Sequence, residues 1–208
     1  MKIFKFGGAS VKDAESVKNV VSIIKNEGAK DTLVVVSAMG KMTNAFEDVI
    51  DSYYHKKEDL PNKLNYIEEF HKNIMSSLFD KTDEVYKEVD VLFGELGWFL
   101  ARNTSQRFNY VYDQIICFGE LLSTRIVSAY LYKIGQENVW FDVRNYIKTD
   151  SNYRDAKVDW DLTEELINKK VDTSKINITQ GFIAANDTEN TTTLGREGSD
   201  YTAGIFAY

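Results

Sequence analysis

The segment Thr32-Leu-Val-Val-Val-Ser37 is a continuous run of aliphatic, mostly β-branched residues. A strand without polar alternation is typical of a parallel sheet, because helices cover both of its faces. Apolar runs at Ile3-Phe4, 139–143 and 176–179 fit further strands, and segments of helical period separate them. Alternating strands and helices predict an α/β fold with a mostly parallel sheet that is covered on both faces.

The helical segments follow from apolar side chains at spacings of three and four. A helix is expected over about 12–27, with Asp13 as its cap. Two long apolar stripes between 62 and 100 predict a helical hairpin inserted into the α/β core. Further helices are expected near 107–133, with a break at Gly119, and near 162–167. The last element, 201–208, has barely two turns and no cap, so we expect the chain to stop inside a helix.

Composition narrows the class of protein. The chain has 208 residues, 43% of them hydrophobic and one of them proline, with no linker-like stretch, so a single domain is expected. A net charge of −7 without a basic cluster argues against a nucleic-acid partner. The single cysteine, Cys117, lies in an apolar run and fits a buried residue of a reducing compartment. No membrane span or signal peptide is expected, and the location that fits is the cytoplasm.

Two segments at opposite ends of the chain have the residues of an anion site. Lys5-Phe-Gly-Gly-Ala-Ser10 follows the first strand, where a cation would face the mouth of a parallel sheet. Gly195-Arg-Glu-Gly-Ser-Asp200 precedes an apolar run, and we expect its Ser-Asp pair to open a helix with free N–H groups. Neither segment is a Walker A motif or a GxGxxG dinucleotide fingerprint, which argues against a Rossmann dehydrogenase.

Six segments in order resemble those of the aspartokinases, the branch of the amino-acid kinase family that phosphorylates the β-carboxylate of aspartate. They are Lys5–Ser10, Ser37-Ala-Met-Gly-Lys-Met-Thr43, Phe118-Gly-Glu-Leu-Leu-Ser123, Trp140-Phe-Asp-Val-Arg144, Thr179-Gln-Gly-Phe182 and Gly195–Asp200. The resemblance covers the chain from residue 3 to its end. It implies a three-layer αβα sandwich, and a kinase domain over 1–208 that is cut short on its nucleotide-binding side and has no regulatory ACT domain.

The resemblance also implies the chemistry: the γ-phosphoryl of ATP passes to L-aspartate and gives 4-phospho-L-aspartate, the first step of lysine, threonine and methionine biosynthesis. Lys5 and Asp200 would be catalytic, Asp200 by orienting Lys5 or by helping to organise the metal-phosphate end. Gly7, Gly8 and Ser10, with Lys5, would bind the phosphates of ATP. Mg²⁺ would arrive with ATP rather than at a protein metal site. A homo-oligomer is expected of the full-length protein.

The substrate-binding residues implied by the resemblance are Ser37, Thr43, Glu120, Arg196 and Ser199. Arg196 would bind the α-carboxylate, Glu120 the α-ammonium, and the three hydroxyl side chains the carboxylates. Each assignment has a structural alternative in the sequence alone. Glu120 reads as a surface acid, Ser37 and Thr43 as loop residues, Asp200 as a helix cap, and Arg196 as a partner of Glu197.

Three departures from the family pattern stand out: Ala9 where relatives often have Thr, Glu197 where many have Gly, and Ala184 where Gly is usual. Two other functions stay open. One is a different carboxylate or phosphate kinase of the same family, acting on N-acetylglutamate, glutamate or uridylate; Glu120 argues against it, because an acylated amine or a nucleotide calls for no acid there. The other is a fragment that binds aspartate without turnover.

Overall fold

A parallel sheet of four strands forms the centre of the computed structural model, which describes residues 1–27 and 31–208. Its strand order is β1-β2-β4-β3, and every neighbouring pair is parallel. The strands are β1 (Lys2–Phe6), β2 (Thr32–Val36), β3 (Asn138–Trp140) and β4 (Ile176–Gln180). All five residues of β2 are buried, as its unbroken apolar run predicts.

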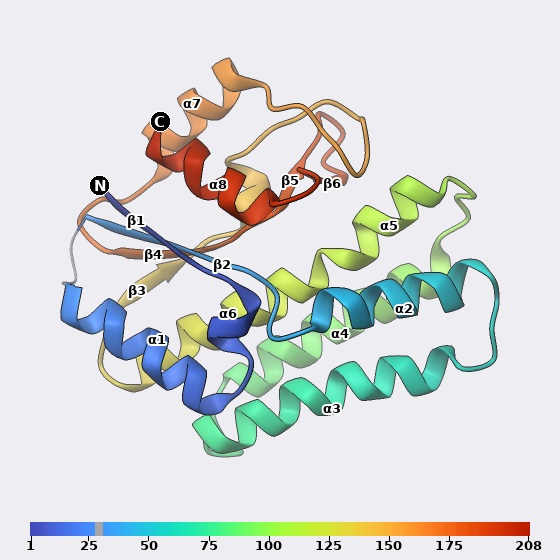
Figure 1. Ribbon diagram of the computed structural model, residues 1–208, viewed down its shortest axis with the longest axis horizontal. Coiled ribbons are helices and arrows are strands. Elements are labelled where there is room, and N and C mark those ends of the chain that lie inside the picture. The colour runs from blue at the N-terminus through green and yellow to red at the C-terminus, as the bar shows by residue number, and fades with distance from the viewer. Residues whose placement is uncertain (28–30) are drawn as a thin grey trace.

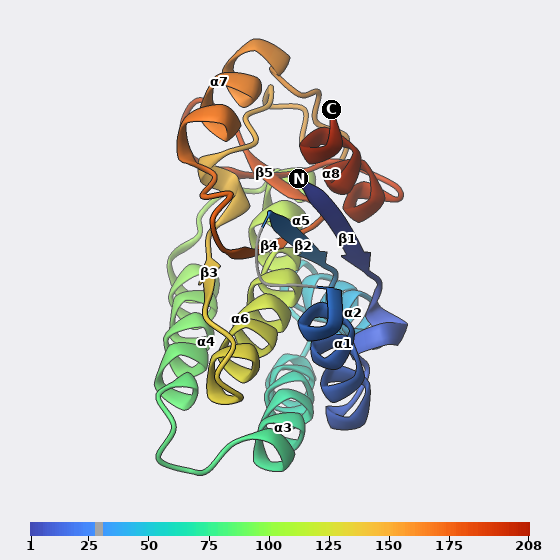
Figure 2. The same cartoon turned by 90° about the vertical axis from the view of Figure 1, so that its left-hand side faces the viewer.

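Helices cover both faces of this sheet. The buried helix α6 (Phe118–Lys133) packs against β2, β3 and β4, with α1 (Ala14–Glu27) beside it. On the other face, α8 (Gly198–Ala207) packs on β1 and β2, and α7 (Trp160–Lys170) lies near it (Figures 1 and 2). The predicted three-layer αβα arrangement is confirmed.

The predicted helical insertion is present and somewhat longer than 62–100. It consists of α3 (Leu60–Leu78) and α4 (Val85–Arg102), which lie beside α2 (Met42–Tyr54) and α6 at one end of the molecule (Figure 1). The buried positions of the two apolar stripes are Ile67, Ile74, Leu78, Val85, Val89 and Leu96. The stripes therefore face the core, as their spacing predicts.

Several boundaries differ from the prediction for local reasons. Helix α1 starts at Ala14, because residues Gly8–Val11 form the short 3-10 helix η1; Asp13 caps α1 by accepting a hydrogen bond from Ser16 N at 2.8 Å. Strand β3 ends at Trp140, because the chain turns into the 3-10 helix η2 (Val143–Asn145), which Asp142 caps.

The break in the long helical stretch lies at Cys117, between α5 (Phe108–Ile116) and α6, and not at Gly119. Gly119 lies inside α6, where a Cβ atom would come within 3.0 Å of the side chain of Ala38. This glycine therefore serves close packing of α6 against the loop after β2, rather than a helix break.

A second sheet was not predicted. Strands β5 (Ile183–Ala185) and β6 (Thr191–Thr193) form an antiparallel pair next to η2 and α5. All three threonines of β6 are buried. The hydroxyl-rich segment that leads into Gly195 is thus a strand before it becomes a loop.

One helical stretch of the described residues, Phe108–Lys133, is long and apolar enough to cross a membrane by length and composition alone. It comprises α5 and α6, and 72% of its most apolar window is buried inside the protein. Such burial is typical of the core helix of a soluble protein.

Candidate functional site

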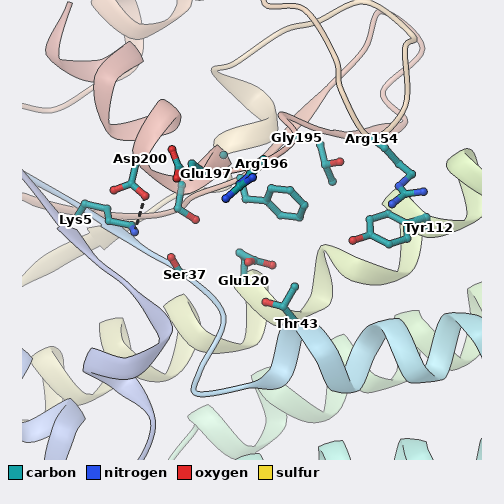
Figure 3. A pocket seen from close by; sticks show the side chains of 14 residues that line it. Lys5, Ser37, Thr43, Tyr112, Glu120, Arg154, Gly195, Arg196, Glu197 and Asp200 are labelled. Atoms are coloured by element: carbon teal, nitrogen blue, oxygen red, sulfur yellow. Dashed lines mark hydrogen bonds and ion pairs between the residues drawn. The ribbon is translucent and has the colours of Figure 1, made fainter.

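A cavity of about 380 Å³ opens at the carboxyl ends of β1 and β2, beside the first turn of α8 (Figure 3). This is the edge of a parallel sheet at which α/β proteins bind their ligands. Its walls include Lys5, Ser37, Thr43, Glu120, Arg196, Ser199 and Asp200. The fold therefore brings together all the residues predicted as catalytic or substrate-binding, from segments at both ends and in the middle of the chain.

Lys5 and Asp200 form an ion pair at one end of the cavity, with Lys5 Nζ 2.9 Å from Asp200 Oδ2 (Figure 3). Lys5 stands on β1, and Asp200 stands in the first turn of α8. The pair therefore joins the two ends of the chain across 195 positions. The helix cap is Glu197 and not Asp200, so Asp200 contacts Lys5 instead of capping α8.

Glu120 lies on the floor of the cavity and is only 3% exposed. Its Oε1 atom accepts a hydrogen bond from Ala38 N at 3.3 Å, while Oε2 has no partner among the described residues. Burial raises the pKa of this carboxyl to about 8. The alternative of a surface acid is wrong, because α6 is buried on nearly all sides.

The start of α8 is fixed against the turn after β4 by two glycines. A Cβ atom at Gly181 would meet Ser199 at 2.5 Å, and one at Gly198 would meet the ring of Phe182 at 2.6 Å. These contacts hold Ser199 at the cavity wall. Glu197, where the family pattern has glycine, adopts a left-handed φ of 58°, a conformation that glycine takes at least cost.

The expectation of a row of free N–H groups at this helix start is only partly met. Gly198 N donates to Gly195 O at 3.1 Å, and Asp200 N donates to Glu197 O at 2.9 Å. These two groups are used in closing the turn. The positive end of the α8 dipole still faces the cavity.

Arg196 is exposed and lies in the middle of the view in Figure 3. In residues 1–27 and 31–208 no ion pair joins it to Glu197 or to another acid. Thr43 stands in the first turn of α2, and Ser37 directly follows β2. The carbonyl of Ser37 accepts a hydrogen bond from Ser123 Oγ at 2.7 Å, which fixes this loop to α6.

The glycine segment after β1 does not itself line the cavity. A Cβ atom at Gly7 would lie 3.6 Å from Lys5 Nζ, so its backbone passes next to that ammonium group. Gly8 packs against the loop after β2, where a Cβ atom would meet Ala38 O at 2.6 Å. Ser10 is exposed, and its N–H donates to Gly7 O at 2.9 Å. The role of these residues toward phosphates stays a prediction.

Sequence reasoning missed the opposite end of the cavity, where Tyr112, Arg154 and Thr193 form the wall. Tyr112 OH donates to Glu47 Oε1 at 2.8 Å, and burial is the main cause that raises the pKa of this phenol. The one available signal was the acid Asp113, which interrupts an apolar helical run.

Among the described residues, no group of three or more His, Cys, Asp or Glu side chains is placed to hold a metal ion. The ionisable side chains that line the cavity are three bases and three acids: Lys5, Arg154 and Arg196, with Glu120, Glu197 and Asp200. This mixture suits a small ligand that carries charges of both signs.

The comparison with known proteins identifies a family for the whole chain. The family model described as "Amino acid kinase family" matches residues 1–208. A bifunctional aspartokinase/homoserine dehydrogenase 2 of Arabidopsis thaliana chloroplasts is 31% identical over 98% of this chain, which corresponds to 23% of that protein.

Two solved structures of Escherichia coli aspartokinase III are similar to this one. The complex with lysine and aspartate aligns with a TM-score of 0.87, and the complex with aspartate and ADP with 0.85. Both are 28% identical to this chain and align over 99% of it. The chain spans 46% of the length of those proteins, so less than half of what they contain is compared.

Proposed function

Because this chain belongs to the amino acid kinase family, we propose that it transfers the γ-phosphoryl group of ATP to the β-carboxylate of L-aspartate. The proposal rests on the likeness to aspartokinases and on the charges of the cavity. The aspartokinases to which the chain is similar are more than twice as long as this chain. The proposal therefore concerns only the chemistry of the cavity described above.

The single observation that carries the proposal is Glu120. Its buried carboxyl group has an oxygen without a partner among the described residues, and two guanidinium groups line the same cavity. This arrangement is complementary to aspartate, which carries one ammonium group and two carboxylates. An acylated amine offers no positive charge to Glu120, and this favours aspartate over an N-acetylated amino acid. Arg196 is assigned the α-carboxylate, which its planar fork suits. Ser37, Thr43 and Ser199 are assigned hydrogen bonds to the two carboxylates.

The chemistry asks little of an acid–base catalyst. The β-carboxylate has a pKa near 4 and is ionised at neutral pH, so it needs no general base. One of its oxygens bonds to the γ-phosphorus, the bond to the bridging oxygen breaks, and ADP leaves with the electron pair. Positioning and charge neutralisation supply the catalysis in such transfers.

Lys5 is assigned to the transferring phosphoryl group, and Asp200 orients it through the 2.9 Å ion pair. The backbone of Gly7 and Gly8, with Ser10, is assigned to the phosphates of ATP near Lys5. Mg²⁺ is expected to enter with ATP, bound mainly by phosphate oxygens and water. The expected location is the cytoplasm, and a homo-oligomer is expected of the full-length protein.

The test is a hydroxylamine-trapping assay with ATP, Mg²⁺ and aspartate, next to a thermal melt that establishes folding. Aspartyl hydroxamate from folded protein supports the proposal. A panel of glutamate, N-acetylglutamate and uridylate identifies another kinase of the family if one of them reacts instead. Folded protein that binds aspartate without turnover indicates the non-catalytic alternative, and folded protein that binds none of these substrates contradicts the proposal.

A further inference from the structure

Arg154 is the cation of the cavity that the family resemblance does not assign. It lies in the loop between η2 and α7, at the end of the cavity away from Lys5 (Figure 3). Its guanidinium carbon is 4.4 Å from the centre of the Tyr112 ring and 5.7 Å from that of Phe108. Stacking on two aromatic rings fixes the plane of a guanidinium while its N–H edge stays free for a ligand.

The guanidinium of Arg154 has no acidic partner among the residues that the structure describes. Arg125 and Arg144, by contrast, pair with Glu88 and Asp142. An arginine that is held in place yet unpaired beside a cavity is suited to binding an anionic group of a ligand.

The backbone at Arg154 is strained. Its φ of 74° is left-handed, a conformation that is unfavourable for a residue other than glycine. Such strain persists only where the surrounding structure enforces it, and it is concentrated at functional sites.

A buried carboxylate enforces this conformation. Asp113 is fully buried, and its Oδ2 atom accepts hydrogen bonds from Arg154 N at 3.0 Å and from Thr193 N at 2.9 Å. Its Oδ1 atom accepts a third hydrogen bond from Thr193 Oγ1 at 2.9 Å. One side chain of α5 thus ties the Arg154 loop to β6, and both of these segments line the cavity.

The charges of the cavity indicate what Arg154 binds. Asp200 already neutralises Lys5, so Arg154 and Arg196 are the two cations left for a substrate carboxylate. Arg154 lies at the end of the cavity away from Lys5, whereas the β-carboxylate must meet the phosphoryl group at the Lys5 end, so the substrate group assigned to Arg154 is the α-carboxylate (Figure 3).

We propose that Arg154 is a specificity-determining residue, whose guanidinium binds the α-carboxylate of the amino-acid substrate together with Arg196. This inference rests on the proposed function. The strained loop then holds Arg154 where it selects substrates with a free α-carboxylate, and Asp113 is the positioning residue of this loop.

The test is calorimetric titration of the 208-residue chain with L-aspartate and with L-isoasparagine, in which the α-carboxylate is an amide. Replacing one charge-assisted hydrogen-bond partner at an exposed position weakens binding by about tenfold. We therefore expect Arg154→Gln to raise the Kd of aspartate by that factor and to change the Kd of isoasparagine much less. Arg154→Lys is expected to keep part of the affinity.

Two further variants separate binding from folding. Arg154→Gly suits the left-handed backbone, so it should melt no lower than the wild type and still lose affinity for aspartate. Arg107→Gln is the matched control, because its guanidinium stacks on Tyr153 at 5.5 Å and does not line this cavity. It should bind aspartate as the wild type does.

The outcomes are distinct. A wild-type chain that binds no aspartate contradicts the proposed function and this inference with it. A wild-type chain that binds aspartate, with Arg154→Gln unchanged or weakened equally for both ligands, overturns the inference alone.

Discussion

Glu120 in the cavity and His71 in the helical hairpin are both buried titratable side chains with one polar atom that lacks a partner among the described residues. Their surroundings differ. Glu120 faces a cavity lined with charged side chains. His71, in α3, makes edge contacts with the rings of Phe70 and Phe93, and its Nδ1 is 2.7 Å from Ile67 O. Burial raises the pKa of Glu120 to about 8 and lowers that of His71 to about 4, so both groups are held neutral.

This difference indicates that the cavity around Glu120 binds a ligand and that the hairpin around His71 has a structural role. A neutral carboxyl that lines a cavity can ionise when a cationic group binds beside it. Burial of Glu120 therefore lowers the free energy of unfolding, and ligand binding raises it again. The histidine of the hairpin has no such opening among the residues around it. Substitutions in the hairpin should therefore change the free energy of unfolding alone, whereas substitutions in the cavity should also change ligand binding.

The largest effect is expected at the phosphoryl end of the cavity. Replacing Lys5 by alanine removes the cation assigned to the transferring phosphoryl group, and loss of one such group costs about 10²–10³ in kcat. We expect turnover in the hydroxylamine assay to fall by at least that factor, while aspartate binding stays within about twofold because Lys5 contacts the phosphoryl end only.

Lys2→Ala is the control for this variant. Lys2 stands on the same strand but pairs with Glu27, away from the cavity. It should keep wild-type turnover. Loss of aspartate binding in Lys5→Ala along with turnover contradicts the division of roles between the two ends of the cavity.

The next effect lies in the hairpin. Ile67 is fully buried in α3, and truncation of such a side chain to alanine costs about 2–5 kcal/mol. Ile67→Ala should lower the free energy of unfolding in urea by that amount and leave the aspartate Kd of the folded protein unchanged. A parallel loss of affinity shows that hairpin and cavity are coupled, against the separation drawn here.

The fold could be predicted because its elements carry local signals. The unbroken apolar run of β2 is typical of a strand buried on both faces, and the stripes of α3 and α4 have the helical period that places one face in the core. The antiparallel pair β5 and β6 had no such signal. Thr191–Thr193 is polar in composition, and it is buried because Asp113, 80 residues earlier, accepts the hydrogen bonds of Thr193.

The residues of the cavity likewise fall into those that the sequence could predict and those that it could not. Lys5, Glu120 and Asp200 stand in sequence segments that resemble a family, so they could be named without knowing their contacts. Periodicity alone places Glu120 on the surface, and only the packing of α6 shows that it is buried. Arg154 belongs to none of those segments. Its position depends on a left-handed backbone and on a carboxylate 41 residues away, neither of which a pattern in sequence reveals.

His71 is expected to make the free energy of unfolding depend on pH, by an amount similar to the loss expected for Ile67→Ala. Because its pKa is depressed from 6.5 to about 4, the unfolded chain binds more protons than the folded one between these values. Stability is therefore present above pH 6.5 and is lost as the pH falls, by on the order of 3 kcal/mol at pH 4. His71→Phe should flatten this part of the profile in urea unfolding at pH 4 to 7.

His55→Gln serves as the control, because this histidine is exposed at the end of α2. It should leave the difference between pH 7 and pH 4 in place. If the free energy of unfolding of His71→Phe depends on pH as that of the wild type does, other groups cause the loss of stability at low pH.

The stability of the folded chain is expected to depend on Glu120 in the opposite sense, and Glu120 has in addition a distinct effect on binding. Its pKa is raised from 4.5 to about 8, so the folded chain binds the extra proton between these values, and stability falls as the pH rises through them. Glu120→Gln removes this dependence and should melt higher than the wild type at pH 8. It should also weaken aspartate binding about tenfold or more, since a hydrogen bond to a charged group is lost.

The proton on Glu120 makes its role directly measurable. At pH 7 the empty cavity holds the carboxyl protonated, and an arriving α-ammonium favours the carboxylate, so binding should release about one proton. Titrations in buffers of different ionisation enthalpy then give different heats for the wild type and equal heats for Glu120→Gln. Heats that do not depend on the buffer in the wild type place the ammonium elsewhere. The buried acid of the cavity would then be as inert toward ligand as the buried histidine of the hairpin.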